Sequence, residues 1–120
     1  MAKYSKITAN GLTLASSAKY CNSFYSRFRG LMFSKKLKEK EGLIIDVCLE
    51  SRELSSIHMV FVFFSIDVLW LDSKKKVVDL RRDVKPFYPF IIPKDAARYV
   101  IELPKMSTLA VKVGDILEFD

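Results

Sequence analysis

The segment from Ile7 to Leu14 constrains the fold most. It alternates apolar residues with small or polar ones on both sides of Asn10-Gly11. Asn and Gly tolerate the positive φ that both central residues of a type I′ turn require, so the pattern predicts a two-residue β-hairpin. This is the strongest local signal in the sequence, and it indicates β structure at the start of the chain.

Short apolar segments separated by turn signals predict further strands. We expect strands at residues 43–48, 57–63, 66–71, 77–80, 99–103 and 116–119. Ile57–Phe63 is apolar at nearly every position, as expected for a strand covered on both faces. Three prolines in Lys85–Pro93 predict an extended, aromatic-rich loop there instead.

One short helix is predicted between the hairpin and the next strand. Asn22 or Ser23 can cap it, and Phe24 and Phe28 are spaced four apart, on one helical face. Gly30 follows as a residue that readily adopts the left-handed conformation at a helix end. The helix is therefore expected at Ser23–Arg29.

Many short strands with one helix predict a mainly β fold, a jelly-roll-like β-sandwich or an open barrel. The length of 120 residues predicts a single domain over residues 1–120, and half of the residues are apolar, enough for a dense core. The longest apolar stretch, Met59–Leu71, is shorter than the roughly 20 residues that a membrane-spanning helix needs. We expect a cytoplasmic protein with no membrane partner.

The net charge of +6 favours contact with anions, nucleic acid included. Much of the positive charge lies in Lys35–Lys40 and Lys74–Lys76. The first run is mixed with glutamate and the second follows a turn pattern, so solvated loops explain both more simply than a binding stripe does.

Several fragments, in order along the chain, resemble the motifs of one family, the domain-of-unknown-function 192 family. They are Arg29-Gly30-Leu31-Met32, Glu41-Gly42-Leu43, Ile57-His58-Met59, Ile66-Asp67-Val68 with Leu71-Asp72, Ala97 to Leu103, and Val113-Gly114-Asp115. The resemblance covers nearly the whole chain. It implies a jelly-roll-like β-sandwich with a short helix, and it implies no activity because the family has no established biochemical role.

The chain departs from the family pattern at one place. Where the family has a polar Lys-Asn-Thr, this chain has Val60-Phe61-Val62, and His58 stands at the position of a family tryptophan. A pocket built on those polar groups in relatives would be apolar here.

The residues that could carry chemistry are few. His58 is the only histidine, which argues against a zinc site, and no metal or other cofactor is expected. Cys21 and Cys48 are interpreted as reduced thiols that pack as two small core residues.

Asp67 interrupts an apolar run. An isolated buried carboxylate is costly unless it is paired, so we expect it to contact a cation or backbone donors, specifically Arg29 or Arg81. The rings of Phe87–Phe90 either lie exposed beside basic residues or complete the core at the open end of the fold.

The leading hypothesis is a small non-enzymatic binding module for an unknown ligand, with its site at one end of the β-sandwich. The candidate binding residues are Arg29, His58, Asp67, Arg81 and Tyr88. One alternative is binding of nucleic acid or another polyanion through the basic surface. Another is a hydrolase-like enzyme that uses Cys48 or Asp67 with His58. Enzymatic activity stays undecided, with a non-enzymatic role favoured.

Overall fold

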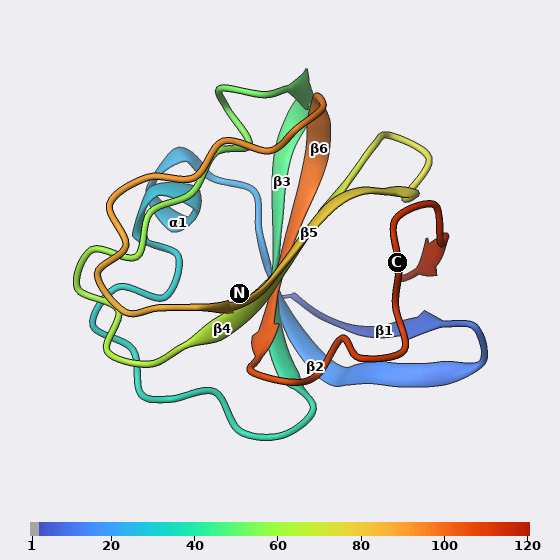
Figure 1. Cartoon of the computed structure of the whole chain (residues 1–120), viewed down its shortest axis with the longest axis horizontal. Coiled ribbons are helices and arrows are strands. Elements are labelled where there is room, and N and C mark those ends of the chain that lie inside the picture. Colours follow the sequence, from blue (N-terminus) through green and yellow to red (C-terminus); the bar gives the residue numbers. More distant parts are fainter. Residues whose placement is uncertain (1–2) are drawn as a thin grey trace.

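The computed structural model describes residues 3–120, apart from the side chains of Phe24 and Tyr25. Seven strands form one sheet in the order β5-β4-β6-β3-β2-β1-β7 (Figure 1). The elements are β1 (Tyr4–Ala9), β2 (Leu12–Cys21), α1 (Phe24–Arg29), β3 (Glu41–Ser51), β4 (Ile66–Leu71), β5 (Val77–Val84), β6 (Ala97–Pro104) and β7 (Leu117–Glu118). The mainly β fold with one short helix is confirmed. Of the two predicted architectures, the open, curled sheet is the one observed.

The first hairpin forms as predicted. Ala9 of β1 pairs with Leu12 of β2, and the two residues between them, Asn10 and Gly11, have φ values of 53° and 77°. Positive φ at both positions is the requirement that the Asn-Gly pair satisfies. β2 then continues past the hairpin and pairs in parallel with β3, which brings the helix that follows it over the sheet.

The predicted helix is also confirmed, with Ser23 as its N-cap. The Ser23 hydroxyl accepts from the Ser26 N–H at 3.1 Å, and the Ser26 hydroxyl accepts from the Ser23 N–H at 3.2 Å. Gly30 follows at a φ of 49°. The predicted alignment of Phe24 with Phe28 lies outside the described residues. No helix in residues 3–120 is long and apolar enough to cross a bilayer.

The central strands β3, β4 and β6 are covered on both faces. Along β4, Val68 and Trp70 belong to one buried cluster, whereas Leu69 and Leu71 belong to another. The first cluster lies on what we call the helix face, because α1 and the loops cover it (Figure 1). The second lies on what we call the barrel face, where β1, β2 and the C-terminal segment cover the sheet (Figure 1).

The barrel face is closed by the curl of the sheet itself. β7, at one edge, pairs with β1, and just before it Ile116 forms a bridge with Lys76, which precedes β5 at the opposite edge. The Val77 N–H donates to the Asp115 carbonyl at 2.8 Å beside this bridge. The two edges of the sheet therefore meet, and the apolar side chains between them are enclosed.

The expected strand at Ile57–Phe63 is not observed. Ile57 makes a single bridge to Ile91, and Met59 exchanges backbone hydrogen bonds with Phe87 and Tyr88. The apolar run Ile57–Phe63 is a loop, and its side chains divide between the core and the surface. Ile57, Met59 and Val62 are buried, whereas Phe61 and Phe63 stand in solvent.

The aromatic segment from Lys85 to Pro93 is the irregular loop that its prolines predict. Phe87, Tyr88 and Phe90 are about half exposed, which settles the choice between exposed rings and rings that complete the core. The interpretation of both cysteines as core residues is half wrong. Cys21 is buried in the helix-face cluster, but Cys48 is exposed and has a φ of 72°.

Asp67 is fully buried and pairs with neither Arg29 nor Arg81, so that expectation is wrong. Its carboxylate accepts from the Asp83 N–H at 3.0 Å, and from the N–H and hydroxyl of Thr108 at 3.2 and 2.7 Å. Uncharged donors thus satisfy the carboxylate. Asp67 links β4 to the end of β5 and to the turn after β6.

We predict that Asp67→Ala lowers the melting temperature by about 10 °C. The substitution leaves three hydrogen-bond donors unpaired, two of them buried, a loss of about 3 kcal/mol in the free energy of unfolding. Thermal denaturation followed by circular dichroism measures it. Asp95→Ala, at an exposed position, is the control. An Asp67→Ala protein that melts with the wild type would show that these contacts do not brace the fold.

Candidate functional site: a cavity beneath the short helix

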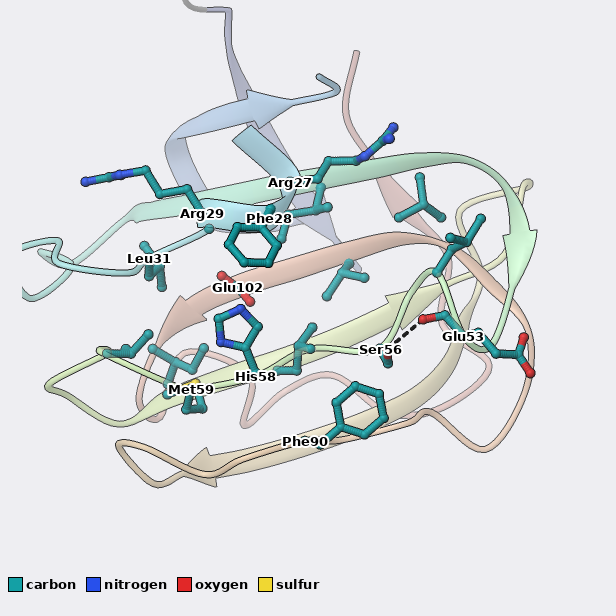
Figure 2. Close-up of a pocket in the computed structure, with 18 residues that line it drawn as sticks. Arg27, Phe28, Arg29, Leu31, Glu53, Ser56, His58, Met59, Phe90 and Glu102 are labelled. Carbon is teal, nitrogen blue, oxygen red and sulfur yellow. Dashed lines mark hydrogen bonds between the residues drawn. The ribbon is translucent and has the colours of Figure 1, made fainter. Parts of the chain in front are cut away.

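A cavity of about 300 Å³ lies on the helix face, between the sheet and its cover of α1 and loops (Figure 2). Its walls are mainly apolar side chains from β3, β6 and the loops, including Leu31, Ile45, Val47, Met59, Val62 and Val100. Six polar or charged residues also line it: Arg27, Arg29, Glu53, Ser56, His58 and Glu102. An apolar pocket with a few converging polar groups is the usual form of a small-molecule site.

Glu102 provides the carboxyl group of the cavity. It lies in β6, between Leu43 of β3 and Val68 of β4, and strand alternation turns its side chain to the helix face with that of Val100. The residue is only 4% exposed. Among the described residues, nothing donates a hydrogen bond to its Oε1 atom. A buried carboxylate oxygen without a partner is costly, so it is a candidate for contact with a ligand.

Burial raises the pKa of Glu102 from 4.5 to about 7. Apolar walls disfavour the ionised form, and no cation among the described residues offsets this effect on the pKa. Near neutral pH the carboxyl group therefore exists in both protonation states. It can accept a hydrogen bond when ionised, and it can also donate one when protonated.

His58 lies in the same part of the cavity. Its Nδ1 accepts from the Val60 N–H at 3.2 Å, so a neutral imidazole carries its hydrogen on Nε2. The ring packs against Phe28 with centroids 5.9 Å apart. Figure 2 shows the His58 ring, the Phe28 ring and the Glu102 carboxyl group turned toward one another. The cavity therefore combines an unpaired acceptor with an imidazole donor.

The two arginines line the cavity through their stems. Figure 2 shows the guanidinium groups of Arg27 and Arg29 directed away from Glu102. The Arg27 group donates to the carbonyls of Asn22 and Asp46, both at 3.3 Å, and lies 3.6 Å from the Cys48 Sγ. The cavity interior is consequently left with a carboxyl group rather than a cationic centre.

The structure brings together two of the five residues predicted for the site. Arg29 and His58 line the cavity, whereas Asp67, Arg81 and Tyr88 do not. Asp67 is a structural brace, Arg81 is exposed on β5, and Tyr88 is exposed in the loop, where its carbonyl accepts from the Met59 N–H at 2.8 Å.

The groups of the hydrolase-like hypothesis are also placed by the structure. Neither Cys48 nor Asp67 lines the cavity that contains His58. Across the described residues, no group of three or more His, Cys, Asp or Glu side chains is arranged to hold a metal ion. Of the polar lining residues, the Ser56 hydroxyl donates to the Glu53 carbonyl at 2.6 Å, whereas the side chains of Glu102 and His58 are turned toward each other (Figure 2).

Glu102 is not among the residues predicted for the site, although the sequence contains a signal for it. In the strand Tyr99–Leu103 it is the one charged residue, and it shares a face with the apolar Val100. An acidic residue on the buried face of a strand covered on both sides is the same kind of anomaly that drew attention to Asp67.

The fold and the site define a class of protein: a mainly β, curled-sheet domain with a largely apolar pocket on one face of the sheet. Within it, the family model of DUF192, described as an uncharacterized ACR, matches residues 5–119. The chain belongs to this family.

Archaeal relatives support the assignment. A UPF0127 protein of Thermococcus kodakarensis is 40% identical over 103 residues, which are 84% of this chain and 63% of that protein. One from Pyrococcus furiosus is 38% identical over 112 residues and 92% of each chain. The chain spans slightly less than two thirds of the length of the Thermococcus relatives that it matches.

Two solved structures share the fold. A proposed transcription regulator from Sinorhizobium meliloti has a TM-score of 0.86 at 18% identity, covering 99% of this chain and 94% of its own. A protein of unknown function from Novosphingobium aromaticivorans has a TM-score of 0.84 at 16% identity, covering 98% and 84%. At these identities the likeness concerns the fold alone.

We predict that Glu102 makes the protein less stable as pH rises. Its folded pKa of about 7 lies above its ordinary value of 4.5, so the free energy of unfolding falls between these pH values and levels off above them. The total fall is roughly 3 kcal/mol. Glu102→Gln should remove this pH-dependent part, as measured by urea denaturation from pH 4 to 9.

Glu118→Gln, at an exposed position, is the matched control and should keep the wild-type pH profile. A Glu102→Gln profile parallel to that of the wild type would show that the carboxyl group is not buried in solution.

Proposed function

We propose that the protein is a binding domain for a small molecule with an apolar body and a hydrogen-bond-donating head group. The observation that carries this proposal is the unpartnered Oε1 of Glu102, an almost completely buried atom that faces the cavity. A ligand that donates to this atom removes the cost of leaving it unpaired.

The cavity limits the size of the ligand. Its volume of about 300 Å³ lies at the lower end of the range for small-molecule sites, so a compact ring or a short aliphatic chain fits it. Leu31, Met59 and Val62 supply apolar contact for that body. Methionine adapts its shape to different apolar partners, which suits a wall that must close around a ligand.

Glu102 and His58 together select the head group. An ionised carboxylate attracts an ammonium or hydroxyl donor, and the Nε2–H of His58 can donate to an oxygen of the same head group. A ligand with a carboxylate or phosphate head is disfavoured, because the guanidinium groups of Arg27 and Arg29 point away from the buried carboxyl (Figure 2). Amines and alcohols are therefore the favoured classes.

A binding role accounts for the site better than the hydrolase-like alternative does. That alternative needs a nucleophile beside the imidazole, but Cys48 and Asp67 both lie outside the cavity walls. The pKa of Glu102 suits proton transfer, but neither Cys48 nor Asp67 lies in the cavity as its nucleophile. Reversible binding requires only the groups that are present.

We predict that benzylamine and benzyl alcohol bind in the cavity, and that phenylacetate, which has the same ring but an anionic head, binds at least about tenfold more weakly. Titrations followed by ¹H–¹⁵N NMR should shift the backbone amides of Gly30 and His58. Phenylacetate binding as tight as that of benzylamine would contradict the proposed head-group selection.

Glu102→Leu is the decisive variant, because it removes the carboxyl group and replaces a buried titratable residue with an apolar one. It should still bind toluene but lose the preference for benzylamine, while Glu118→Leu should behave as the wild type. If both variants bind benzylamine equally well, Glu102 does not hold the head group.

A further inference from the structure

Four phenylalanines from three loops form a cluster on the protein surface, away from either buried core. They are Phe33, Phe61, Phe63 and Phe87, which we call the aromatic cluster. Their exposed fractions are 63%, 43%, 61% and 47%. Single exposed apolar residues are ordinary, but a contiguous exposed group of large rings marks a surface that contacts something else.

The rings hold one another in place. Phe33 stacks on Phe61 with centroids 4.8 Å apart, and Phe63 meets the edge of Phe87 at 5.1 Å. Phe61 and Phe87 join the two pairs in an edge contact at 6.1 Å. The aromatic cluster is therefore one continuous apolar surface, built before any partner arrives.

The backbone is strained to present this surface. Phe33, Phe61 and Phe87 have φ values of 58°, 57° and 62°, a conformation that bulky residues rarely adopt. Each such residue costs on the order of 1–3 kcal/mol and persists only where its surroundings enforce it.

Hydrogen bonds between the loops supply that enforcement. The Phe33 N–H donates to the Phe61 carbonyl, and the Phe87 N–H donates to the Met59 carbonyl, both at 2.9 Å. The three loops are thus cross-linked at the positions where the backbone is strained.

The segments that carry the aromatic cluster are basic, and acidic residues lie just outside them at Asp83 and Glu39. Residues 29–37, 58–65 and 84–92, which carry it, contain four basic residues and no acidic residue: Arg29, Lys35, Lys36 and Lys85. Lys85 already pairs with Asp83 at 2.7 Å, so Lys35 and Lys36, close to Phe33 in the chain, matter most for an anion outside the protein. A suitable partner must offer apolar material beneath a negatively charged surface.

We propose that the aromatic cluster docks on the surface of an anionic lipid bilayer, with its rings inserted among the lipids and Lys35 and Lys36 at the head groups. This arrangement is typical of peripheral membrane contacts. Single-stranded nucleic acid fits less well, because bases stack on free ring faces and Phe33 and Phe61 stack on each other. The expectation of no membrane partner rested on the lack of a spanning segment. No helix of residues 3–120 could span a bilayer, but a peripheral contact needs none.

The test is co-sedimentation with vesicles of phosphatidylglycerol and, separately, of phosphatidylcholine. The protein should bind the anionic vesicles and bind them less as salt rises. Phe61→Asn with Phe63→Ser should weaken the partition coefficient at least about tenfold. Replacing Lys35 and Lys36 with Gln should weaken it roughly fivefold for each lysine. Asn tolerates the left-handed conformation, so the first variant is expected to fold.

Leu12→Ser with Leu109→Ser is the matched control, because it removes two exposed apolar side chains elsewhere and should not change vesicle binding. Three results would overturn the proposal. The wild type could fail to bind phosphatidylglycerol vesicles, or the phenylalanine variant could bind as well as the wild type. Alternatively, the wild type could bind an oligothymidine, or form a dimer in analytical ultracentrifugation, without binding vesicles. The phenylalanine variant would then lose that binding or that dimer.

Discussion

The structure depends on one constraint, the need to cover both faces of the central strands. β4 is buried at all six of its positions, and β6 is buried at six of eight. Strands of this kind are not stable in a sheet that has one face in solvent, because their apolar side chains point to both faces. The rest of the chain therefore acts as two covers. On the barrel face, the sheet curls until its edges meet at Lys76 and Ile116.

The helix face has a less regular cover. A six-residue helix and three loops form this cover, and the loops satisfy backbone groups by hydrogen-bonding to each other at Phe33, Met59 and Phe87. Trp70 links this cover to the sheet, since its indole N–H donates to the Ser55 carbonyl at 2.7 Å. An irregular cover does not interdigitate with the sheet as a second sheet would. The cavity beside Glu102 and the exposed rings of the aromatic cluster both result from this irregular cover.

Local chemistry could be predicted from the sequence, whereas contacts between loops could not. The Asn10-Gly11 turn, the Ser23 cap and the limits of β4 follow from residue types and spacing, and all are observed. The segment Ile57–Phe63 was misassigned because an apolar run does not reveal whether its partner is a strand or another loop. Of the five residues proposed for a site, Arg29 and His58 line the candidate cavity. Glu102 was overlooked because nothing in a single strand shows that its neighbours leave a space beside it.

Glu102 and the aromatic cluster both cost stability, and both belong to the same half of the molecule. A leucine at position 102 would remove a buried carboxyl group, and asparagine at Phe61 would relieve a left-handed backbone. Stabilising changes of this kind are readily accessible to natural proteins, so costly groups usually persist where function requires them. Cost alone would not distinguish the two, but their chemistry does. One is a recessed hydrogen-bond acceptor suited to a small molecule, and the other is a raised apolar surface suited to an extended partner.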